Sequence, residues 1–179
     1  MERMVGRQAP QFDMEAVFPD QSFGKVSLDE CMKDARWTVL FFYPMDFTFV
    51  CPTEITALSD RYDEFEALDA TVIGASTDTI HTHLAWIKTP RSENGLGPLH
   101  FPLAADTNHQ VAKQYGVLIE EEGVALRGLF IISPAGELQY QVINHNNIGR
   151  DVDETLRVLQ ALQTGALCPA NWKPGQQTL

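Results

Sequence analysis

The sequence is poor in cysteine, in positive charge and in long apolar runs, and each shortage excludes a class of protein. Its three cysteines, Cys31, Cys51 and Cys168, are an odd number at wide spacing, which does not fit a secreted disulfide scaffold. Lys and Arg total 13 against 24 Asp and Glu, and the net charge of −11 repels phosphate backbones and anionic lipid surfaces. The longest apolar run, residues 37–45, is too short to cross a bilayer. We therefore expect a protein that binds neither nucleic acid nor a membrane.

What the sequence does contain is sufficient for one domain with a substantial core, because 44% of its 179 residues are hydrophobic. The N-terminal stretch MERMVGRQAPQFDM has no continuous apolar core of the kind that a signal peptide needs, so we expect a cytoplasmic protein. From Gly165 the sequence GALCPANWKPGQQTL holds two prolines and two glycines and has no periodic apolar face. The expected organisation is a domain over residues 1–164 and a mobile arm, residues 165–179, that carries Cys168.

A strand, a helix and a second strand follow one another in the first half of the chain. Residues 35–43 are rich in β-branched and aromatic side chains and nearly all apolar, which is typical of a strand buried on both faces of a sheet. After Pro52, apolar residues recur at helical spacing as far as Leu68, with acidic residues on the other face. Residues 71–76 have the composition of a second buried strand. This order predicts a parallel pair joined by a right-handed crossover, and hence an α/β fold.

The second half of the chain adds helices and a hairpin to this pair. Residues 90–106 contain too much Gly and Pro for a helix or a strand, and we expect an ordered surface excursion there. The turn-forming cluster at 133–137 separates two strand-like runs and predicts an antiparallel hairpin. Asp151 and Glu154 have the spacing of a capping box at the start of a helix. The remaining predicted elements are helices over 79–88 and 108–115 and strands over 126–132 and 138–143.

Cys51 lies between the first strand and the helix, directly before Pro52. Proline is well tolerated at the first position of a helix, so this cysteine is expected at the helix N-terminus, where unpaired N–H groups and the helix dipole favour a negative charge. The alternative is a small buried apolar residue, as most free cysteines are. An ordinary thiol is about 3% ionised at pH 7, so full ionisation raises the thiolate concentration by roughly 30-fold at most. A cysteine enzyme built here would also need donors that stabilise charge in the transition state.

A family resemblance is carried by the residues around this cysteine. Residues 44–51, PMDFTFVC, fit the pattern PxxxTxxC, and the longer string FYPMDFTFVCPTE resembles the typical two-cysteine peroxiredoxins of the alkyl hydroperoxide reductase C type. The resemblance covers nearly the whole chain and implies a thioredoxin-like α/β fold, with a central mixed sheet flanked by helices. Further similar segments follow in the expected order: the loop NGLG at 94–97, EGVALRGLFI around Arg127, NIGRDVDETLR around Arg150 and CPANW around Cys168.

The resemblance implies roles for the residues near the thiol. Cys51 is similar to the peroxidatic cysteine, and Thr48 and Arg127 are similar to the residues that hold the peroxide and stabilise the transition state. An Arg guanidinium supplies fixed N–H donors, and a Thr hydroxyl can both accept a hydrogen bond from the peroxide and donate one. Pro44 would shield the pocket.

Two further charged residues resemble the ion network that fixes the orientation of Arg127 in this family. They are Glu54, three residues beyond Cys51, and Arg150. The alternative for each is a surface salt bridge, which contributes little.

The implied reaction is the reduction of hydrogen peroxide or an organic hydroperoxide, in which Cys51 becomes a sulfenic acid without a metal, haem or flavin cofactor. Cys168 resembles the resolving cysteine, which the other subunit of a homodimer supplies, and relatives often assemble further into decamers. Thioredoxin or a flavoprotein disulfide reductase would then reduce the disulfide. A disulfide needs Cα atoms about 4.4–6.8 Å apart, so the first helical turn must unwind and the arm must move.

The C-terminal arm departs from the pattern of eukaryotic relatives that are sensitive to over-oxidation. Those relatives extend the chain with a helix that bears a Tyr-Phe pair, whereas neither residue type follows Cys168 here. Asn94 also stands where the sensitive pattern usually has Gly. We therefore expect a bacterial-type enzyme that unwinds easily and resists over-oxidation.

Two other functions share parts of this pattern. A thioredoxin-like disulfide exchanger needs a Cys-x-x-Cys pair, and Cys51-Pro52-Thr53-Glu54 lacks the second cysteine. A non-catalytic role, as a ring-forming holdase or a redox-relay partner, is an alternative that is compatible with the peroxidase hypothesis.

The remaining residues of chemical interest have no family role. Cys31 precedes the first strand, and we expect a structural thiol. His81 and His83 have H-x-H spacing but do not share a helix face and have no further clustered ligands, so we expect solvated surface groups and no metal site. Trp86 is expected to serve packing.

Overall fold

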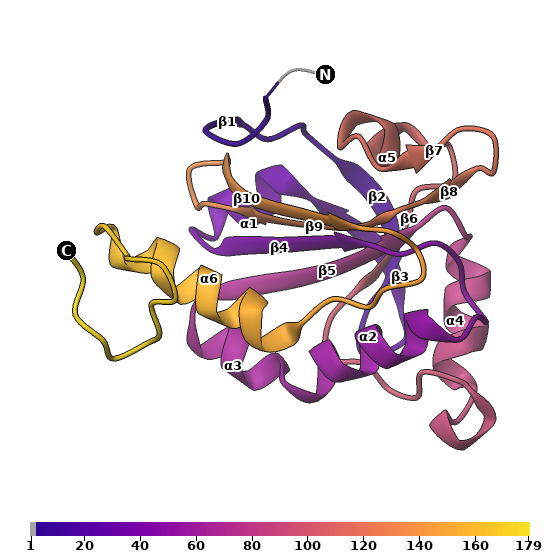
Figure 1. Ribbon diagram of the computed structural model, residues 1–179. Coiled ribbons are helices and arrows are strands. Elements are labelled where there is room, and N and C mark those ends of the chain that lie inside the picture. The colour runs from indigo at the N-terminus through magenta and orange to yellow at the C-terminus, as the bar shows by residue number, and fades with distance from the viewer. Residues whose placement is uncertain (1–2) are drawn as a thin grey trace.

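The chain folds around one eight-stranded mixed sheet with helices on both faces (Figure 1). The structure is a computed structural model that describes residues 3–179. Across the sheet the strands are β1 (Arg7–Gln8), β10 (Glu137–Asn144), β9 (Arg127–Ile132), β4 (Trp37–Phe42), β5 (Ala70–Ser76), β6 (Leu103–Ala105), β2 (Asp13–Val17) and β3 (Phe23–Ser27). A separate antiparallel pair consists of β7 (Leu118–Ile119) and β8 (Val124–Ala125). The predicted α/β fold with a mixed central sheet is confirmed.

The sheet separates two hydrophobic cores. In β4, Val39 and Phe41 belong to one core and Leu40 and Phe42 to the other, as the two-residue repeat of a strand requires. All four side chains are fully buried, which confirms a strand covered on both faces. The first core also takes residues from α2 (Val50–Asp60), α3 (Tyr62–Ala67), α4 (Ile80–Lys88) and α6 (Val152–Thr164), and the second from α1 (Leu28–Lys33) and α5 (Gln110–Gln114). Within residues 3–179, no helix is long and apolar enough to span a membrane.

The strand pairing follows the predicted order. β4 pairs in parallel with β5, across the crossover that contains α2 and α3, and antiparallel with β9. β9 and β10 form the predicted hairpin, with a register irregularity between Leu138 and Tyr140. The side chain of Asp151 accepts a hydrogen bond from the backbone N–H of Glu154, which confirms the N-cap half of the predicted capping box, while the Glu154 carboxylate pairs with Arg157. These pairings place the carboxyl end of β4 at the centre of the sheet, directly before α2.

The helix predicted after Pro52 is two helices. α2 ends at Asp60 and α3 begins at Tyr62, because Arg61 between them has non-helical backbone angles of φ −109° and ψ 17°. α2 also begins earlier than predicted, at Val50, so Pro52 is its third residue. Proline is still tolerated there, since the N–H groups of the first turn have no partner within the helix. Cys51 therefore lies within the first turn and not before it.

The prediction that residues 90–106 form a surface excursion is wrong for half of that segment. Arg91–Glu93 is an exposed 3-10 turn, but Leu96, Leu99 and Phe101 are buried. β6 follows and pairs with β5 on one side and β2 on the other. A three-residue strand is too short to show a hydrophobic period. The N-terminal hairpin of β2 and β3, which covers this edge, was not predicted either.

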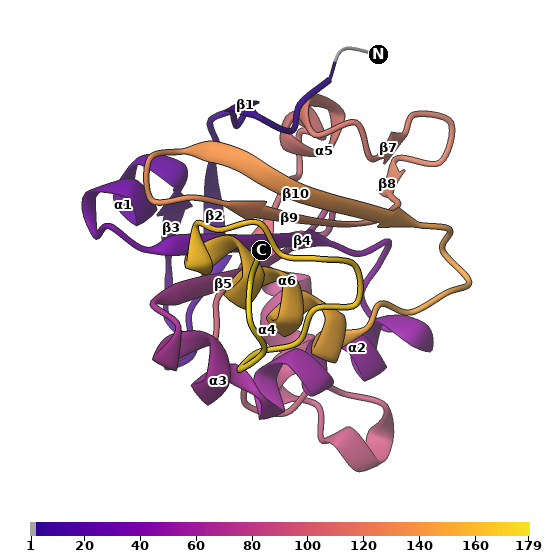
Figure 2. The same cartoon turned by 60° about the vertical axis from the view of Figure 1, so that its left-hand side comes forward.

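The C-terminal arm, residues 165–179, contains no helix or strand but is attached to α6. Figure 2 shows the arm crossing in front of that helix. Trp172 is the anchor: its side chain is 4% exposed, and its carbonyl oxygen accepts a hydrogen bond from Arg157 Nη1 at 2.9 Å. The arm begins at Gly165, whose φ of +64° ends α6. One buried aromatic residue fixes this segment, and such an anchor leaves no periodic pattern in the sequence.

Cys31 lies on α1 and belongs to the second core, as expected for a structural thiol. It is 8% exposed, and burial raises the pKa of its thiol above the ordinary value. Only the thiolate is an effective nucleophile. Both effects make Cys31 unreactive in the folded protein.

We expect Cys31 to react with iodoacetamide more slowly than Cys168 in the reduced, folded protein at about pH 8. The raised pKa of Cys31 lowers the fraction of its thiol that is ionised at this pH. Cys31 is also buried, whereas Cys168 is only half-buried. Mass spectrometry of samples quenched over time would measure both rates, and concentrated urea should remove the difference. If Cys31 reacted as fast as Cys168 without urea, the thiol would not be buried as described.

Candidate active site

Cys51 lies in the first turn of α2, beyond the active-site loop, which we define as residues 44–49 between β4 and α2. Its side chain is fully buried. The helix begins after Phe49, whose side chain makes no capping hydrogen bond. The unpaired N–H groups of this turn and the positive end of the helix dipole therefore lie next to the sulfur.

Arg127 is the first residue of β9 and brings a guanidinium to this thiol. Its Nη1 donates a hydrogen bond to Cys51 Sγ at 3.3 Å and to Glu54 Oε2 at 3.1 Å. Its Nε donates to the carbonyl oxygen of Asn146 at 2.9 Å, which fixes the plane of the group. A single nitrogen thus connects the thiol to a carboxylate one helical turn away.

Arg150 completes a buried ion network around Glu54. Its Nη2 and Nε lie 2.6 Å and 3.0 Å from the two carboxylate oxygens, and its backbone N–H donates to Glu54 Oε1 at 2.7 Å. Its Nη1 donates to the carbonyl oxygens of Phe42 and Gly128 at 2.7 Å and 2.6 Å. The side chains of Glu54, Arg127 and Arg150 are 4%, 4% and 6% exposed. The alternative of surface salt bridges is therefore wrong, and the excess positive charge faces the thiol.

Thr48 and Pro44 both lie in the active-site loop and are half-buried. Thr48 Oγ1 donates to the carbonyl oxygen of Met45 at 2.9 Å, which leaves lone pairs of its oxygen free to accept a hydrogen bond from another molecule. Within residues 3–179, the Cys51 thiol accepts its hydrogen bond from Arg127 and not from Thr48. The structure thus brings Cys51, Arg127 and the Glu54 network together.

Cys168 is not part of this constellation within one chain. Its Sγ lies 3.5 Å from Thr164 Oγ1 and donates to the carbonyl oxygen of Ala161 at 3.8 Å, beside the end of α6. Figure 1 places the arm beyond that end of α6, on the opposite side of the molecule from the loop that joins β4 to α2. A reaction between Cys51 and Cys168 therefore needs movement, a second copy of the chain, or both.

The prediction that both histidines of the H-x-H pair are surface groups is wrong for His83. His81 is exposed, but His83 is fully buried and its Nδ1 lies 2.6 Å from Asp46 Oδ2. Its Nε2 lies 2.9 Å from the carbonyl oxygen of Ala104. Both ring nitrogens of His83 therefore face oxygen atoms of the protein. Burial raises the pKa of Asp46, although the hydrogen bond with His83 opposes the rise.

Tyr43 extends this buried network and is also fully buried. Its hydroxyl donates to Asp46 Oδ1 at 2.6 Å, and burial, together with the Asp46 carboxylate, raises the pKa of the phenol well above its ordinary value. The network fixes the base of the active-site loop to α4. Sequence reasoning missed it because Asp46 and His83 are 37 positions apart, and helix periodicity describes only near neighbours.

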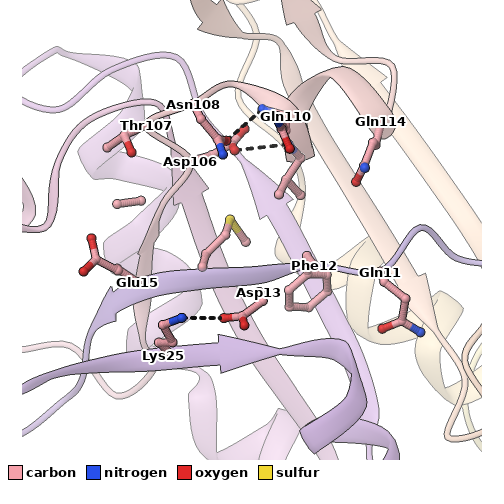
Figure 3. Close-up of a pocket in the computed structure, with 13 residues that line it drawn as sticks. Gln11, Phe12, Asp13, Glu15, Lys25, Asp106, Thr107, Asn108, Gln110 and Gln114 are labelled. Carbon is pink, nitrogen blue, oxygen red and sulfur yellow. Dashed lines mark hydrogen bonds and ion pairs between the residues drawn. The ribbon is translucent and has the colours of Figure 1, made fainter.

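A polar pocket of about 260 Å³ lies elsewhere, between β2, β3 and α5 (Figure 3). Lys25 Nζ lies 3.7 Å from Asp13 Oδ1 at its rim, and the carboxylate of Asp106 accepts from the backbone N–H groups of Val111 and Ala112. These groups are already paired, and no cysteine lines the pocket. Within residues 3–179 no group of three or more His, Cys, Asp or Glu side chains could hold a metal ion.

Comparisons with known proteins show which family the sequence is similar to. A model described as the AhpC/TSA family matches residues 5–141. The sequence is 81% identical over 178 residues to a Bacillus subtilis protein named putative peroxiredoxin YkuU, with 99% of each chain covered. It is 53% identical over 180 residues to the chloroplastic 2-Cys peroxiredoxin BAS1 of Spinacia oleracea, which covers 98% of this chain and 67% of the spinach protein.

A solved structure extends the similarity to the whole fold. The crystal structure of the reduced 2-Cys peroxiredoxin of Plasmodium vivax matches with a TM-score of 0.96 and 41% identity. The match covers 99% of this chain and 93% of the other.

We expect Glu54→Gln to lower the free energy of unfolding by about 3–5 kcal/mol, because it leaves two buried guanidinium groups without their carboxylate. Urea unfolding of both proteins measures the difference. Glu64→Gln is the matched control, since it removes one carboxylate from the exposed pair with Arg61. That change should cost about 0–1 kcal/mol. Equal effects of the two substitutions would show that the buried network contributes no more than a surface pair.

Proposed function

Because the chain belongs to the AhpC/TSA family and is a peroxiredoxin, a thiol peroxidase with an antioxidant function, we propose that Cys51 is the residue that attacks the peroxide. The observation that carries this assignment is the 3.3 Å hydrogen bond from Arg127 Nη1 to Cys51 Sγ. It joins a sulfur in the first turn of a helix to a buried guanidinium. No other cysteine of the chain has such surroundings among the described residues, since Cys31 lies in the apolar core and Cys168 beside a helix C-terminus.

In the first step, the Cys51 thiolate attacks the terminal oxygen of a hydroperoxide. An S–O bond forms and the O–O bond breaks, so that sulfur loses two electrons and becomes a sulfenic acid. The remaining oxygen takes a proton and leaves as water or an alcohol. Arg127 donates to the oxygens on which charge develops, and Thr48 accepts from the peroxide hydroxyl. Pro44 shields the site, and Glu54 and Arg150 orient Arg127. No cofactor takes part.

Donors are needed because ionisation alone gives little acceleration. Full ionisation raises the thiolate concentration by roughly 30-fold at most, and nucleophilicity falls as a thiol becomes more acidic. A positioned donor in a water-excluded site typically contributes a factor of about 10²–10³. Most of the rate is therefore assigned to Arg127 and Thr48 and less to the helix dipole.

In the second step, the Cys168 thiol of a second copy condenses with the sulfenic acid, which releases water and forms a disulfide. The arm of the same chain lies on the far side of the molecule, which favours a partner subunit as the source. Since Cys51 is fully buried, its helical turn must unwind before the two Cα atoms can approach to about 4.4–6.8 Å. A dithiol reductant, thioredoxin or a flavoprotein disulfide reductase, then supplies two electrons and two protons.

This mechanism requires a homo-oligomer in which residues 165–179 serve as an arm and residues 1–164 as the catalytic domain. The working unit is a homodimer, and five dimers form a decamer. Several similar proteins carry "2-Cys" in their names, which supports the use of a second cysteine. The proposed location is the cytoplasm.

Mixing the reduced protein with one equivalent of hydrogen peroxide tests these assignments. We expect a covalent dimer on a non-reducing gel, formed by the parent and by Cys31→Ser. Cys168→Ser should consume peroxide but form no dimer, and Cys51→Ser should do neither. Cys31→Ser is the matched control because that thiol is buried in the core away from the site. Peroxide consumption by Cys51→Ser at the parent rate would disprove the central assignment.

A second test separates Arg127 from the helix dipole. We expect Arg127→Lys to lower the second-order rate constant for peroxide by about 10²-fold, because a lysine cannot present the same fixed donors. Alkylation of Cys51 by iodoacetamide needs the thiolate but not the peroxide donors, so its rate should fall by less than about tenfold. Stopped-flow kinetics and mass spectrometry measure the two rates. Equal losses in both would assign Arg127 to ionisation alone.

A further inference from the structure

We infer that Asn94 is a positioning residue of this active site, whose side-chain amide holds the Thr48 end of the active-site loop closed. The inference rests on the proposed roles of Cys51 and Thr48. Asn94 Nδ2 donates to the carbonyl oxygen of Thr48 at 3.0 Å, although the two residues are 46 positions apart. This contact connects the active-site loop to a segment that contains no reacting group.

The backbone of Asn94 is fixed by a buried side chain. Its carbonyl oxygen accepts a hydrogen bond from Trp86 Nε1 at 2.9 Å, and Trp86 is fully buried on α4. Asn94 has a left-handed backbone with φ of +61°. The backbone of the next residue, Gly95, packs so closely against Thr89 that a Cβ there would lie 1.9 Å from the carbonyl oxygen of Thr89. The backbone of Asn94 is therefore held in place, and its exposed side-chain amide reaches the Thr48 carbonyl oxygen from there.

The segment that carries Asn94 is also attached to the far end of α2. Arg91 Nη1 and Nη2 donate to the two carboxylate oxygens of Asp60, the last residue of α2, at 2.9 Å and 2.8 Å. Arg91 Nε donates to the carbonyl oxygen of Leu96 at 3.1 Å. The segment that carries Asn94 is thus held at the C-terminal end of α2, and Asn94 contacts the loop at the N-terminal end of the same helix.

Trp86 contacts both Asn94 and Phe47, the residue before Thr48 in the active-site loop. Its ring packs against Phe47, with 5.7 Å between the ring centroids, and its Nε1 holds Asn94. Phe47 has a left-handed backbone with φ of +57°, a conformation that a bulky residue adopts only when its surroundings impose it. The loop is therefore held at two adjacent residues, by a ring contact at Phe47 and by the amide at Thr48.

The type of residue at position 94 matters for this contact, and the contact argues against the expectation that Asn94, in place of Gly, lets the helical turn unwind easily. Glycine also adopts a left-handed backbone but offers no amide, and aspartate has the shape of asparagine but cannot donate to a carbonyl. Substitution by either should loosen Thr48 while the base of the loop stays fixed by Asp46 and His83. A looser Thr48 should slow the peroxide step, and easier opening of the loop should speed disulfide formation. One neutral hydrogen bond is worth about 0.5–1.5 kcal/mol, which corresponds to roughly two- to tenfold in each rate.

Stopped-flow measurements on Asn94→Asp and Asn94→Gly test the inference. Tryptophan fluorescence follows the peroxide step and then disulfide formation, because Trp86 contacts the loop. In both variants we expect the first rate constant to fall and the second to rise, each roughly two- to tenfold. Asn108→Asp is the matched control: it introduces the same charge at an exposed position in the pocket of Figure 3, and should change neither rate.

Opposite changes in the two steps are the signature of positioning, since general destabilisation would not accelerate one of them. Two unchanged rate constants, or two rate constants that fall together with the melting temperature, would overturn the inference. If one variant does not fold, the other decides, because both remove the same donor. The Cys51→Ser result is separate: peroxide reduction without Cys51 would refute the proposed function, whatever Asn94 does.

Discussion

The buried carboxylate of Glu54 between two guanidinium groups is the interaction on which the site depends. It allows two arginines to be buried together, because each cation finds an opposite charge and several hydrogen bonds. Arg150 connects this carboxylate to the carbonyl oxygens at the ends of β4 and β9, and Arg127 extends it to the sulfur. The network thereby joins the centre of the sheet, the first turns of α2 and the start of β9. Burying these charges orients Arg127, because Asn146 holds its Nε and Glu54 holds its Nη1, and the same Nη1 faces the thiol.

The position that brings the thiol to Arg127 also hides it. Cys51 is fully buried, so in the proposed mechanism a small peroxide would be reduced inside the closed site, whereas a second thiol would not reach the sulfur there. The active-site loop is held by separate contacts at its base and near its end. Asp46 is held at the base of the loop by His83 and Tyr43, and Thr48 is held near its end by Asn94. An opening that starts at Thr48 can therefore leave the base of the loop in place.

How much of this was predictable depends on the distance in sequence over which each feature is encoded. The position of Cys51 follows from a local pattern, a buried strand followed by a cysteine, a proline and a helix. The Glu54–Arg127 contact spans 73 positions, and only the family resemblance indicated it; its burial was not evident from either residue. His83 was misjudged for the same reason, since its partner Asp46 lies outside its helix. β6 was missed because a strand of three residues is too short to show a hydrophobic period. The anchor at Trp172 was missed because a single residue shows none.

The network also bears on how the site would open under the proposed mechanism. The N–H groups of the first helical turn have no partner within the helix, so unwinding residues 50–53 breaks only the helical hydrogen bonds that the carbonyl oxygens of these four residues accept. Glu54 lies just beyond that turn, and its bonds to Arg150 need not break. One contact that holds the turn is the hydrogen bond from the charged guanidinium of Arg127 to the sulfur. In the proposed mechanism the peroxide reaction replaces a thiolate by a neutral sulfenic acid, so the attraction between Arg127 and the sulfur would weaken after that step.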